Sequence, residues 1–345
     1  MPKLFFLLSG EHKTLPFAET KAILKAEGVA YKGSQLLPQV LRLDSSVDAV
    51  AAIAARAALT RTCCQELFCC NASLGEIVKA TQAAPLDTFL KPNESFAVRV
   101  RRVGEAGRDL PSMSLERKLG EIVLNKIKKS KVNLEHPRKT FFGTITDGCF
   151  VFGLIIREVS PTPFVQRRPR KRPFFHPSAM PAKLARCMVN LARAKKGDFV
   201  LDPFCGTGSF LIEAGLLGCR VFGVDAKKRM IRGSIRNLKF FNIEFEGLAV
   251  AEARHLPLAK VDCIVTDPPY GRSASTMGQT TKQIVQEFLK MSADRMAKGQ
   301  RMCIASPRTV RLCERAKELG FRRIQSHFVY VHRSLTREIA VLEQS

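Results

Sequence analysis

The sequence predicts an α/β protein in which a basic, proline-rich linker joins an N-terminal α+β region to a C-terminal domain built on a parallel sheet. The C-terminal prediction rests on apolar strands that show no alternation with polar residues and are separated by helical segments. The linker prediction rests on prolines and cations concentrated in residues 160–180. A length of 345 residues leaves room for two or three domains.

The first region, residues 1–66, shows the patterns of a strand and of helices. Residues 4–9 are mainly apolar and predict a strand, whereas residues 17–27 and the alanine-rich residues 47–59 predict helices. Glycine and proline separate these elements. We therefore expect a small α+β region.

The second region, residues 67–159, combines a basic strand with an amphipathic helix. Residues 96–102 alternate apolar and basic side chains, which is typical of a half-buried strand. Ser114 is expected to cap a helix over residues 115–129, which carries one apolar stripe. Residues 141–146 and 149–156 predict strands joined by an Asp-Gly turn.

The linker, residues 160–180, carries a cluster of cations between prolines that favour an extended chain. The clustered cations are Arg167, Arg168, Arg170, Lys171 and Arg172. The whole chain has 56 Lys and Arg against 31 Asp and Glu, a net charge of +25. This excess favours polyanionic partners, with nucleic acid ahead of an anionic membrane surface. The cluster is therefore a candidate phosphate contact, and a solvated linker is the alternative.

The third region, residues 181–345, alternates strands with helices. The expected strands are residues 199–201, 221–224, 263–266, 302–305, 328–332 and 338–342. The expected helices are residues 210–217, 227–240, 281–296 and 310–319. This order predicts a parallel sheet covered by helices on both faces.

A glycine turn, Asp202-Pro-Phe-Cys-Gly-Thr-Gly208, follows the first strand of this region. Its glycines permit a tight turn and close approach of the backbone to a ligand at the sheet edge where such folds bind ligands. A dinucleotide fingerprint and a P-loop are both absent from the sequence, which argues against NAD and ATP. Asp225 ends the next strand and suits ribose hydroxyls, although it also suits a helix cap. Glu252 is a candidate contact for an adenine amino group.

The tetrapeptide Asp267-Pro268-Pro269-Tyr270 follows the strand over residues 263–266. The prolines stiffen the backbone, so that the Asp267 carboxylate and the Pro268 carbonyl form a rigid pair of acceptors. Such a pair can hold the hydrogens of an exocyclic amine and align its lone pair for in-line methyl transfer. Asp267 can also accept the released proton, and Tyr270 can stack on a base. A rigid turn without chemistry is the alternative.

The 11 cysteines are unevenly spaced. Cys63, Cys64, Cys69 and Cys70 would share a face only on a helix, so a metal site is a weak alternative to reduced thiols in a cytoplasmic protein. We expect no bound metal. The sequence also shows no export signal and no apolar run of about 20 residues, so we expect no membrane role.

The order of acidic residues and glycines after residue 181 resembles the class I methyltransferases, which have a Rossmann-like domain and use S-adenosyl-L-methionine as cofactor. The resemblance implies a cofactor site formed by residues in and after the glycine turn. These residues are Asp202, Phe204, Gly206, Thr207, Gly208, Asp225, Ala226, Glu252, Ala253 and Asp267.

Nearly the whole chain resembles the archaeal tRNA guanine-10 N2-methyltransferases. The matching segments are residues 170–177, 183–186, 190–191, 202–208, 267–271 and 332–337. The resemblance implies a ferredoxin-like segment at residues 1–66, a THUMP domain at residues 67–159 and a methyltransferase domain at residues 181–345. One departure is Ala251-Glu252-Ala253, where the family usually has Gly-Asp-Ala.

The same resemblance implies the substrate and the partners. The expected reaction places one or two methyl groups on the N2 amine of a flipped-out tRNA guanine, catalysed by Asp267, Pro268 and Tyr270. Arg99, Arg101 and Lys118 of the THUMP-like region join the linker cations as expected RNA-binding residues. The chain is expected to act as a monomer, and a small activator subunit is a candidate partner.

Three competing functions stay open. The target guanosine can lie in the acceptor stem, because the distance between the RNA grip and the active site decides the target. A DNA adenine-N6 methyltransferase would share the chemistry of Asp267–Tyr270, although the THUMP-like region argues against it. A non-catalytic RNA-binding protein is disfavoured by intact Asp202, Asp225 and Asp267.

Overall fold

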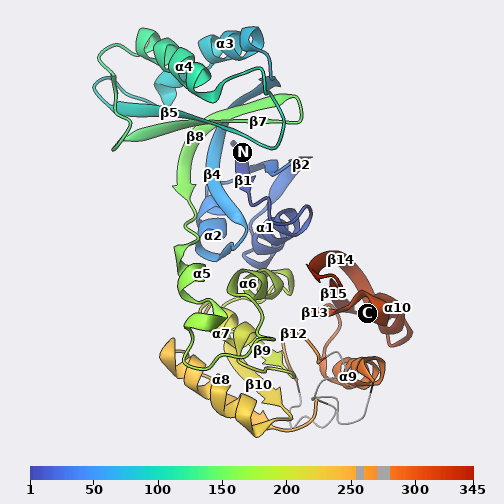
Figure 1. Ribbon diagram of the computed structural model, residues 1–345. Helices are drawn as coiled ribbons and strands as arrows, with labels where there is room; N and C mark the ends of the chain where they lie inside the picture. The colour runs from blue at the N-terminus through green and yellow to red at the C-terminus, as the bar shows by residue number, and fades with distance from the viewer. Residues whose placement is uncertain (254–259, 270–279) are drawn as a thin grey trace. The chain divides into compact units, whose positions relative to one another are not determined.

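The computed structural model describes residues 1–253, 260–269 and 280–345, and the chain divides into two compact units. The N-terminal unit comprises Met1–Phe17, Val29–Ala55 and Thr60–Ser160. The C-terminal unit comprises Pro161–Ser345 together with Ala18–Gly28 and Arg56–Leu59. Figure 1 follows the chain through the elements of both units.

The N-terminal unit is built on one eight-stranded sheet with the order β2-β3-β1-β4-β8-β7-β5-β6. The strands are β1 (Lys3–Leu8), β2 (Tyr31–Leu37), β3 (Val40–Ser45), β4 (Thr60–Asn71), β5 (Ser95–Arg102), β6 (Lys131–Val132), β7 (Lys139–Thr146) and β8 (Cys149–Glu158). The helical elements are α2 (Asp48–Arg56), α3 (Leu74–Ala83), η1 (Leu86–Thr88) and α4 (Ser112–Lys126). Strand β5 pairs in parallel with β6 and β7, and the other neighbours are antiparallel.

Helices α3 and α4 lie on the same face of the strands β5 and β7 in Figure 1. They pack there through fully buried apolar residues such as Ile77, Leu119 and Phe141. The apolar stripe predicted for the helix after residue 115 therefore faces the sheet.

The structure of this unit bears on three interpretations of the sequence. Strand β4 runs through the boundary expected at residue 67 and pairs with β8, so the two expected regions share one sheet. Helix α4 begins at Ser112 after Pro111, and Ser114 lies inside its first turn instead of capping it. The cysteine cluster lies on strand β4, where adjacent residues face opposite sides, so the helical spacing that would gather the four thiols is absent.

The linker contains helical turns instead of a uniformly extended chain. Helix α5 (Thr162–Gln166) and the 3₁₀ turn η2 (Pro169–Lys171) each have a proline in their first two positions. A proline there loses no helical hydrogen bond and its φ angle suits the first turn, which explains why a proline-rich segment forms short helices.

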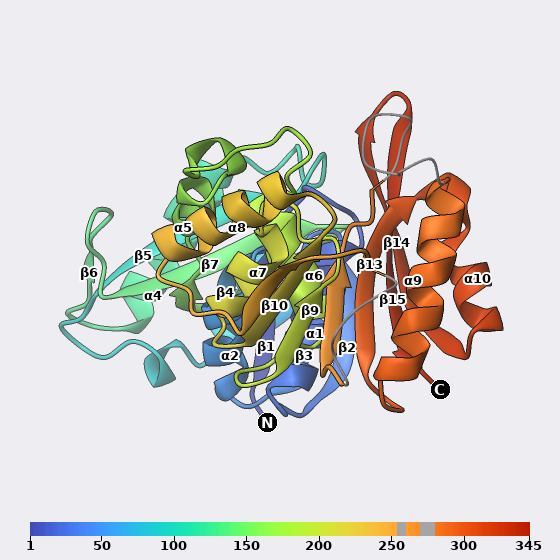
Figure 2. The same cartoon turned by 90° about the horizontal axis from the view of Figure 1, so that it is seen from below.

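The C-terminal unit is built on a seven-stranded sheet with the order β11-β10-β9-β12-β13-β15-β14. The strands are β9 (Phe199–Asp202), β10 (Arg220–Asp225), β11 (Gly247–Val250), β12 (Cys263–Thr266), β13 (Arg301–Pro307), β14 (Phe321–His332) and β15 (Leu335–Gln344). The helical elements are α6 (Ala182–Leu191), α7 (Ser209–Gly215), α8 (Lys228–Phe240), α9 (Thr281–Arg295), η3 (Arg308–Val310) and α10 (Leu312–Glu318), and most of α1 (Leu15–Ala26) joins them. Figure 2 shows the strands β10 and β9 side by side, and β12 separates β9 from β13.

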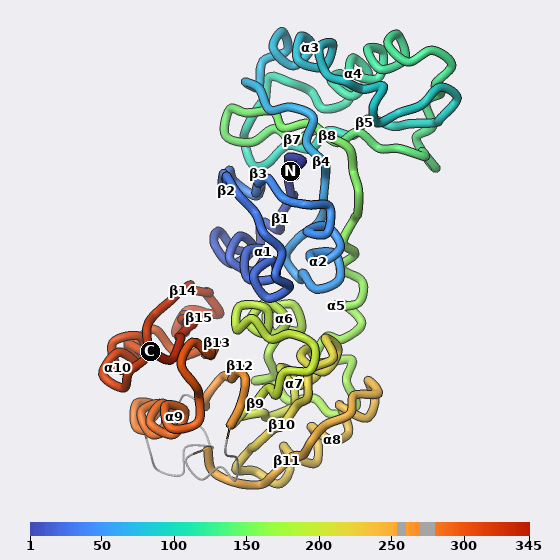
Figure 3. Tube along the Cα trace, turned by 180° about the vertical axis from the view of Figure 1, so that it is seen from behind, coloured from blue at the N-terminus to red at the C-terminus, as the bar shows by residue number. Residues whose placement is uncertain are grey.

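The expected all-parallel sheet is wrong at one strand. Strands β11, β10, β9, β12 and β13 pair in parallel, but β15 inserts antiparallel between β13 and β14. The turn at residues 333–334 is too short for a parallel crossover, so β14 and β15 form a hairpin. In Figure 3 this hairpin and the helices α9 and α10 occupy the C-terminal part of the trace.

The core of this unit lies between the sheet and α9, with Ile264, Phe288 and Ile304 fully or almost fully buried. Helix α6 and strand β11 were not expected from the sequence. Within the three described ranges, no helix is both long enough and apolar enough to span a bilayer.

Candidate functional site

A cavity of about 620 Å³ opens at the carboxyl ends of the strands in the C-terminal unit. Strand β9 lies between β10 and β12. The chain passes from β9 to β10 and β11 on one side and then returns to β12 on the other side of β9. Open α/β sheets bind ligands at this switch point, because the loops that follow the two strands diverge and leave a crevice. The predicted residues that line the cavity are Asp202, Phe204, Gly206, Thr207, Asp225, Ala226, Glu252, Ala253, Asp267 and Pro268.

Asp202 ends β9 and is fully buried. Its Oδ1 accepts hydrogen bonds from Thr266 Oγ1 at 2.7 Å and from the Phe204 amide at 3.2 Å. Its Oδ2 is buried and has no hydrogen-bond partner among the described residues. Burial, helped by the nearby carboxylates of Asp225 and Asp267, raises the pKa of Asp202 to about 8.

The glycine turn depends on backbone that favours glycine. Gly206 and Gly208 have φ angles of +50° and +81°. A Cβ on Gly208 would also collide with Ser234 Oγ of α8. Gly208 therefore shapes the turn without lining the cavity, whereas the other predicted residues of the turn face it.

Asp225 ends β10 and connects that strand to the glycine turn. Its Oδ2 accepts a hydrogen bond from the Gly206 amide at 3.0 Å, and its Oδ1 accepts one from the Lys227 amide at 2.9 Å. Lys227, not Asp225, is the N-cap residue of α8. Burial raises the pKa of Asp225, and the hydrogen bonds from the Lys227 and Gly206 amides oppose the rise.

Asp267, Pro268 and Pro269 follow β12 directly and line the same cavity. The Asp267 Oδ2 lies 3.4 Å from Nη2 of Arg337, which comes from β15 on the far side of β13, and both side chains are largely buried. Tyr270, the predicted stacking residue, lies outside the described residues.

The cavity also contains residues that were not predicted as site residues. These are His176, Ser178, Ala179, Met180, Pro203, Cys205, Ser209, Phe210, Lys227, Met230, Ala251, Pro269, Ile284, Glu287, Phe288 and Arg337. His176 and Arg337 do lie in segments that carried the family resemblance. They reach the cavity because of the strand order and the path of the linker. Neither of these can be predicted from a local sequence pattern.

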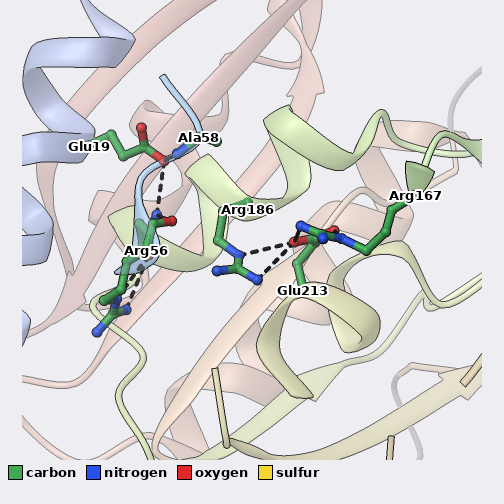
Figure 4. A network of polar contacts seen from close by, with 7 residues as sticks. Glu19, Arg56, Ala58, Arg167, Arg186 and Glu213 are labelled. Atoms are coloured by element: carbon green, nitrogen blue, oxygen red, sulfur yellow. Dashed lines mark hydrogen bonds and ion pairs between the residues drawn. The ribbon is translucent and has the colours of Figure 1, made fainter. Parts of the chain in front are cut away.

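Two of the predicted RNA-binding cations, Arg167 and Arg172, are turned into the protein. Figure 4 shows Arg167 and Arg186 converging on Glu213. The fully buried Glu213 carboxylate accepts hydrogen bonds from Arg167 at 2.8 and 3.1 Å and from Arg186 at 3.0 Å. The Arg167 guanidinium is therefore engaged by Glu213, and its expected contact with phosphate stays a prediction.

Arg172 is 5% exposed and donates hydrogen bonds to Ser209 Oγ at 2.7 Å and to the Arg167 carbonyl at 3.0 Å. Burial lowers its pKa to about 10. Ser209 follows the glycine turn and lines the cavity, so Arg172 supports the cavity wall, and its expected contact with phosphate stays a prediction.

The remaining predicted cations are accessible. Arg168, Arg170, Lys171, Arg101 and Lys118 are exposed, and Arg99 is partly buried. Arg99 donates a hydrogen bond to the Leu134 carbonyl at 2.7 Å. Their role in RNA binding stays a prediction.

A second polar group ties residues from the first sixty positions to the C-terminal unit (Figure 4). The buried Glu19 carboxylate accepts hydrogen bonds from the amides of Ala58 and Leu59 at 3.0 and 2.8 Å and from Asn190 Nδ2 at 2.9 Å. Burial raises the pKa of Glu19. These contacts explain why Ala18–Gly28 and Arg56–Leu59 group with the C-terminal unit.

Comparisons with known proteins agree on the organisation of the chain. Residues 169–338 match the RMKL-like methyltransferase domain, and residues 71–152 match the THUMP domain. TrmN from Thermus thermophilus has a similar fold, with a TM-score of 0.57 at 21% identity over 99% of this chain and 100% of that chain.

Curated relatives extend the match to the full length. The tRNA (guanine(10)-N2)-dimethyltransferase of Methanothermobacter thermautotrophicus is 37% identical over 99% of both chains. The enzyme of the same name from Methanocaldococcus jannaschii is 35% identical over 73% of this chain and 71% of its own length. The THUMP and methyltransferase domains, joined in this order, and the match of 37% identity over 99% of both chains show that the chain belongs to the family of archaeal tRNA (guanine(10)-N2)-dimethyltransferases.

Proposed function

We propose that this enzyme transfers methyl groups from S-adenosylmethionine to the N2 amine of guanosine 10 in tRNA. The observation that carries the proposal is that one cavity joins the carboxylates of Asp202, Asp225 and Glu252 to the Asp267–Pro268 turn. The position of the target rests on the names of the relatives. Two successive transfers, as those names imply, are part of the proposal.

The residues of the cavity fit S-adenosylmethionine. Its volume of about 620 Å³ lies within the range of small-molecule sites. The buried Asp202 Oδ2, which has no hydrogen-bond partner among the described residues, is complementary to an ammonium group. Asp225 would hold ribose hydroxyls, while Phe204 and Met230 offer apolar contacts to a base. When bound, the cofactor supplies a methyl group activated by a positive sulfur.

Asp267 and Pro268 would hold the acceptor amine. The carboxylate and the proline carbonyl accept its two hydrogens, which aims the nitrogen lone pair at the incoming methyl group. Asp267 then takes the proton that the methylated amine releases. The guanidinium of Arg337, 3.4 Å from the Asp267 Oδ2, limits the rotation of the carboxylate.

The decisive experiment is methyl transfer with the purified chain. A tRNA transcript with guanosine 10 and a matched transcript with adenosine 10 are incubated with labelled cofactor, and the products are analysed by nucleoside mass spectrometry. We expect N2-methylguanosine and then N2,N2-dimethylguanosine in the first transcript only. Methylation of both transcripts at an acceptor-stem guanosine, or methylation of adenine in duplex DNA instead, would refute the assignment.

Two variants separate catalysis from binding. Asp267→Ala should abolish transfer while leaving tRNA and cofactor affinity within a few-fold. Glu318→Ala, on the exposed face of α10, is the control and should transfer at the wild-type rate. If the wild-type chain bound tRNA but transferred no methyl group, this result would favour the non-catalytic alternative.

We further propose that the chain acts as a monomer in the cytoplasm, with a small activator subunit as a candidate partner. The test is the same assay on a size-fractionated monomer. Activity only in a dimer fraction would overturn the monomer, whereas activity that appears only on addition of a second protein would identify an activator subunit.

A further inference from the structure

The hairpin of β14 and β15 extends beyond its neighbours at one edge of the seven-stranded sheet. Strand β13 pairs with β15 only from Arg301 to Pro307, and its last partner on β15 is Arg337. Strand β14 continues to pair with β15 up to Leu335. The tip of the hairpin therefore projects past the sheet, as Figure 2 shows for the dark red strands.

This hairpin adjoins the catalytic cavity. Arg337 of β15 lines the cavity and lies 3.4 Å from the Asp267 carboxylate. Its cross-strand neighbour on β14 is Val329. A nucleotide that enters the cavity must leave its neighbours in the strand outside, and the hairpin is part of the rim that those neighbours meet.

The exposed side chains of the hairpin include two aromatic rings at alternate positions of β14 and polar residues at its tip. Phe328 is 48% exposed and Tyr330 is 71% exposed, and His332 and Arg333 are exposed at the tip. The Arg308 guanidinium lies 5.2 Å from the centre of the Phe328 ring. Large exposed aromatic rings beside cations are the pattern that binds unpaired nucleotides, by stacking and by phosphate contact.

The charge of this surface has one sign. From Leu319 to Arg337 the sequence contains arginine and histidine but no acidic residue. The next carboxylate, Glu338, is 6% exposed and accepts hydrogen bonds from Ser326 and Cys313. A polyanion fits this surface better than a neutral or basic protein segment would, although β14 is also an edge strand.

We propose that the hairpin tip binds the nucleotides that flank the target guanosine, with Tyr330 stacking on a base and Arg308 and Arg333 contacting phosphates. This inference rests on the proposed function and adds the surface that guides the RNA strand into the cavity. Phe328 adds a second aromatic ring to this surface, and the Arg308 guanidinium covers one face of that ring.

The test is the kinetics of methyl transfer to full-length tRNA by Tyr330→Ala and Tyr330→Phe. Because Tyr330 is 71% exposed, neither variant should lose stability. We expect Tyr330→Ala to lower kcat/KM for tRNA by about 5- to 150-fold, the value of one base stack, and Tyr330→Phe to keep most of it. Cofactor affinity, measured by calorimetry, should not change in either variant.

The matched control is Phe240→Ala, which removes an aromatic ring that is 57% exposed on α8. It should leave kcat/KM for tRNA unchanged. In a second measurement, Arg333→Ala should lower the slope of log affinity for tRNA against log salt by about one.

Equal kinetics for Tyr330→Ala and Phe240→Ala, together with an unchanged salt slope, would overturn the inference and favour a protein-docking edge. That result is distinguishable from failure of the proposed function. In the latter case the wild-type chain itself would transfer no methyl group to tRNA.

Discussion

Removing the charge of Glu213 should destabilise the C-terminal unit far more than removing the charge of a surface glutamate. Glu213 has no exposed side-chain surface, and its partners Arg186 and Arg167 are 6% and 13% exposed. In Glu213→Gln the two guanidinium groups stay in place with only a neutral amide between them. Breaking a buried ion pair in this way costs about 3–5 kcal/mol.

The matched control is Glu246→Gln. Glu246 pairs with Arg220 at 2.7 Å, a distance as short as those at Glu213, but both side chains are well exposed. Water and salt screen such a pair, so its loss should have little effect. The two variants therefore differ in burial and not in contact distance.

Scanning calorimetry is the appropriate assay, because the chain has no tryptophan to report unfolding by fluorescence. For a unit of about 200 residues, we expect Glu213→Gln to lower Tm by about 6–20 °C. Glu246→Gln should melt close to the wild type. Equal melting of the two variants would refute the claim that Arg167 and Arg186 depend on Glu213.

Three further predictions follow from the cavity. Because the pKa of Asp202 is about 8, its carboxyl is protonated at pH 6–7 in the free protein and must release a proton to receive an ammonium group. Cofactor affinity should therefore rise from pH 6 to pH 7.5, by at most about tenfold per pH unit. Calorimetry in buffers of different ionisation enthalpy should detect the release of a proton when the cofactor binds, and Asp202→Asn should show no such release. Gly208→Ala should weaken cofactor binding and lower Tm, because its φ is +81° and the new methyl group would overlap Ser234 Oγ; wild-type affinity by calorimetry would contradict this. Arg337→Met should lower kcat by about 10- to 100-fold through misplacement of Asp267, with little change in cofactor affinity; equal losses of both would indicate a collapsed cavity instead.

The same pKa shift affects stability in the opposite direction. The pKa of Asp202 is raised in the folded chain above its unfolded value of about 3.9. The folded state therefore binds more protons between these values, and the contribution of Asp202 to stability is present at low pH and is lost as pH rises toward 8. Cofactor binding and stability of the free chain should thus respond oppositely to pH in this range.

Elements whose signals are local could be predicted from the sequence. The strand over Cys263–Thr266 has the predicted bounds, and the Asp147-Gly148 turn joins β7 and β8 as predicted. The glycine turn and the Asp267–Pro268 segment follow their strands as expected, because strand ends and turn residues are read from adjacent positions. Parallel strands bring their carboxyl ends to one edge, so the order of these motifs also predicted that they share a site.

Tertiary structure alone decided which cations face solvent and which strands become neighbours. Arg167 and Arg168 are adjacent in a basic run, yet Arg167 is paired with buried Glu213 and Arg168 is exposed. Arg337 meets Asp267 only because β15 inserts beside β13. Charge and local pattern specify what a side chain can bind, whereas its actual partner depends on long-range packing, in which residues far apart in sequence compete for the same buried space.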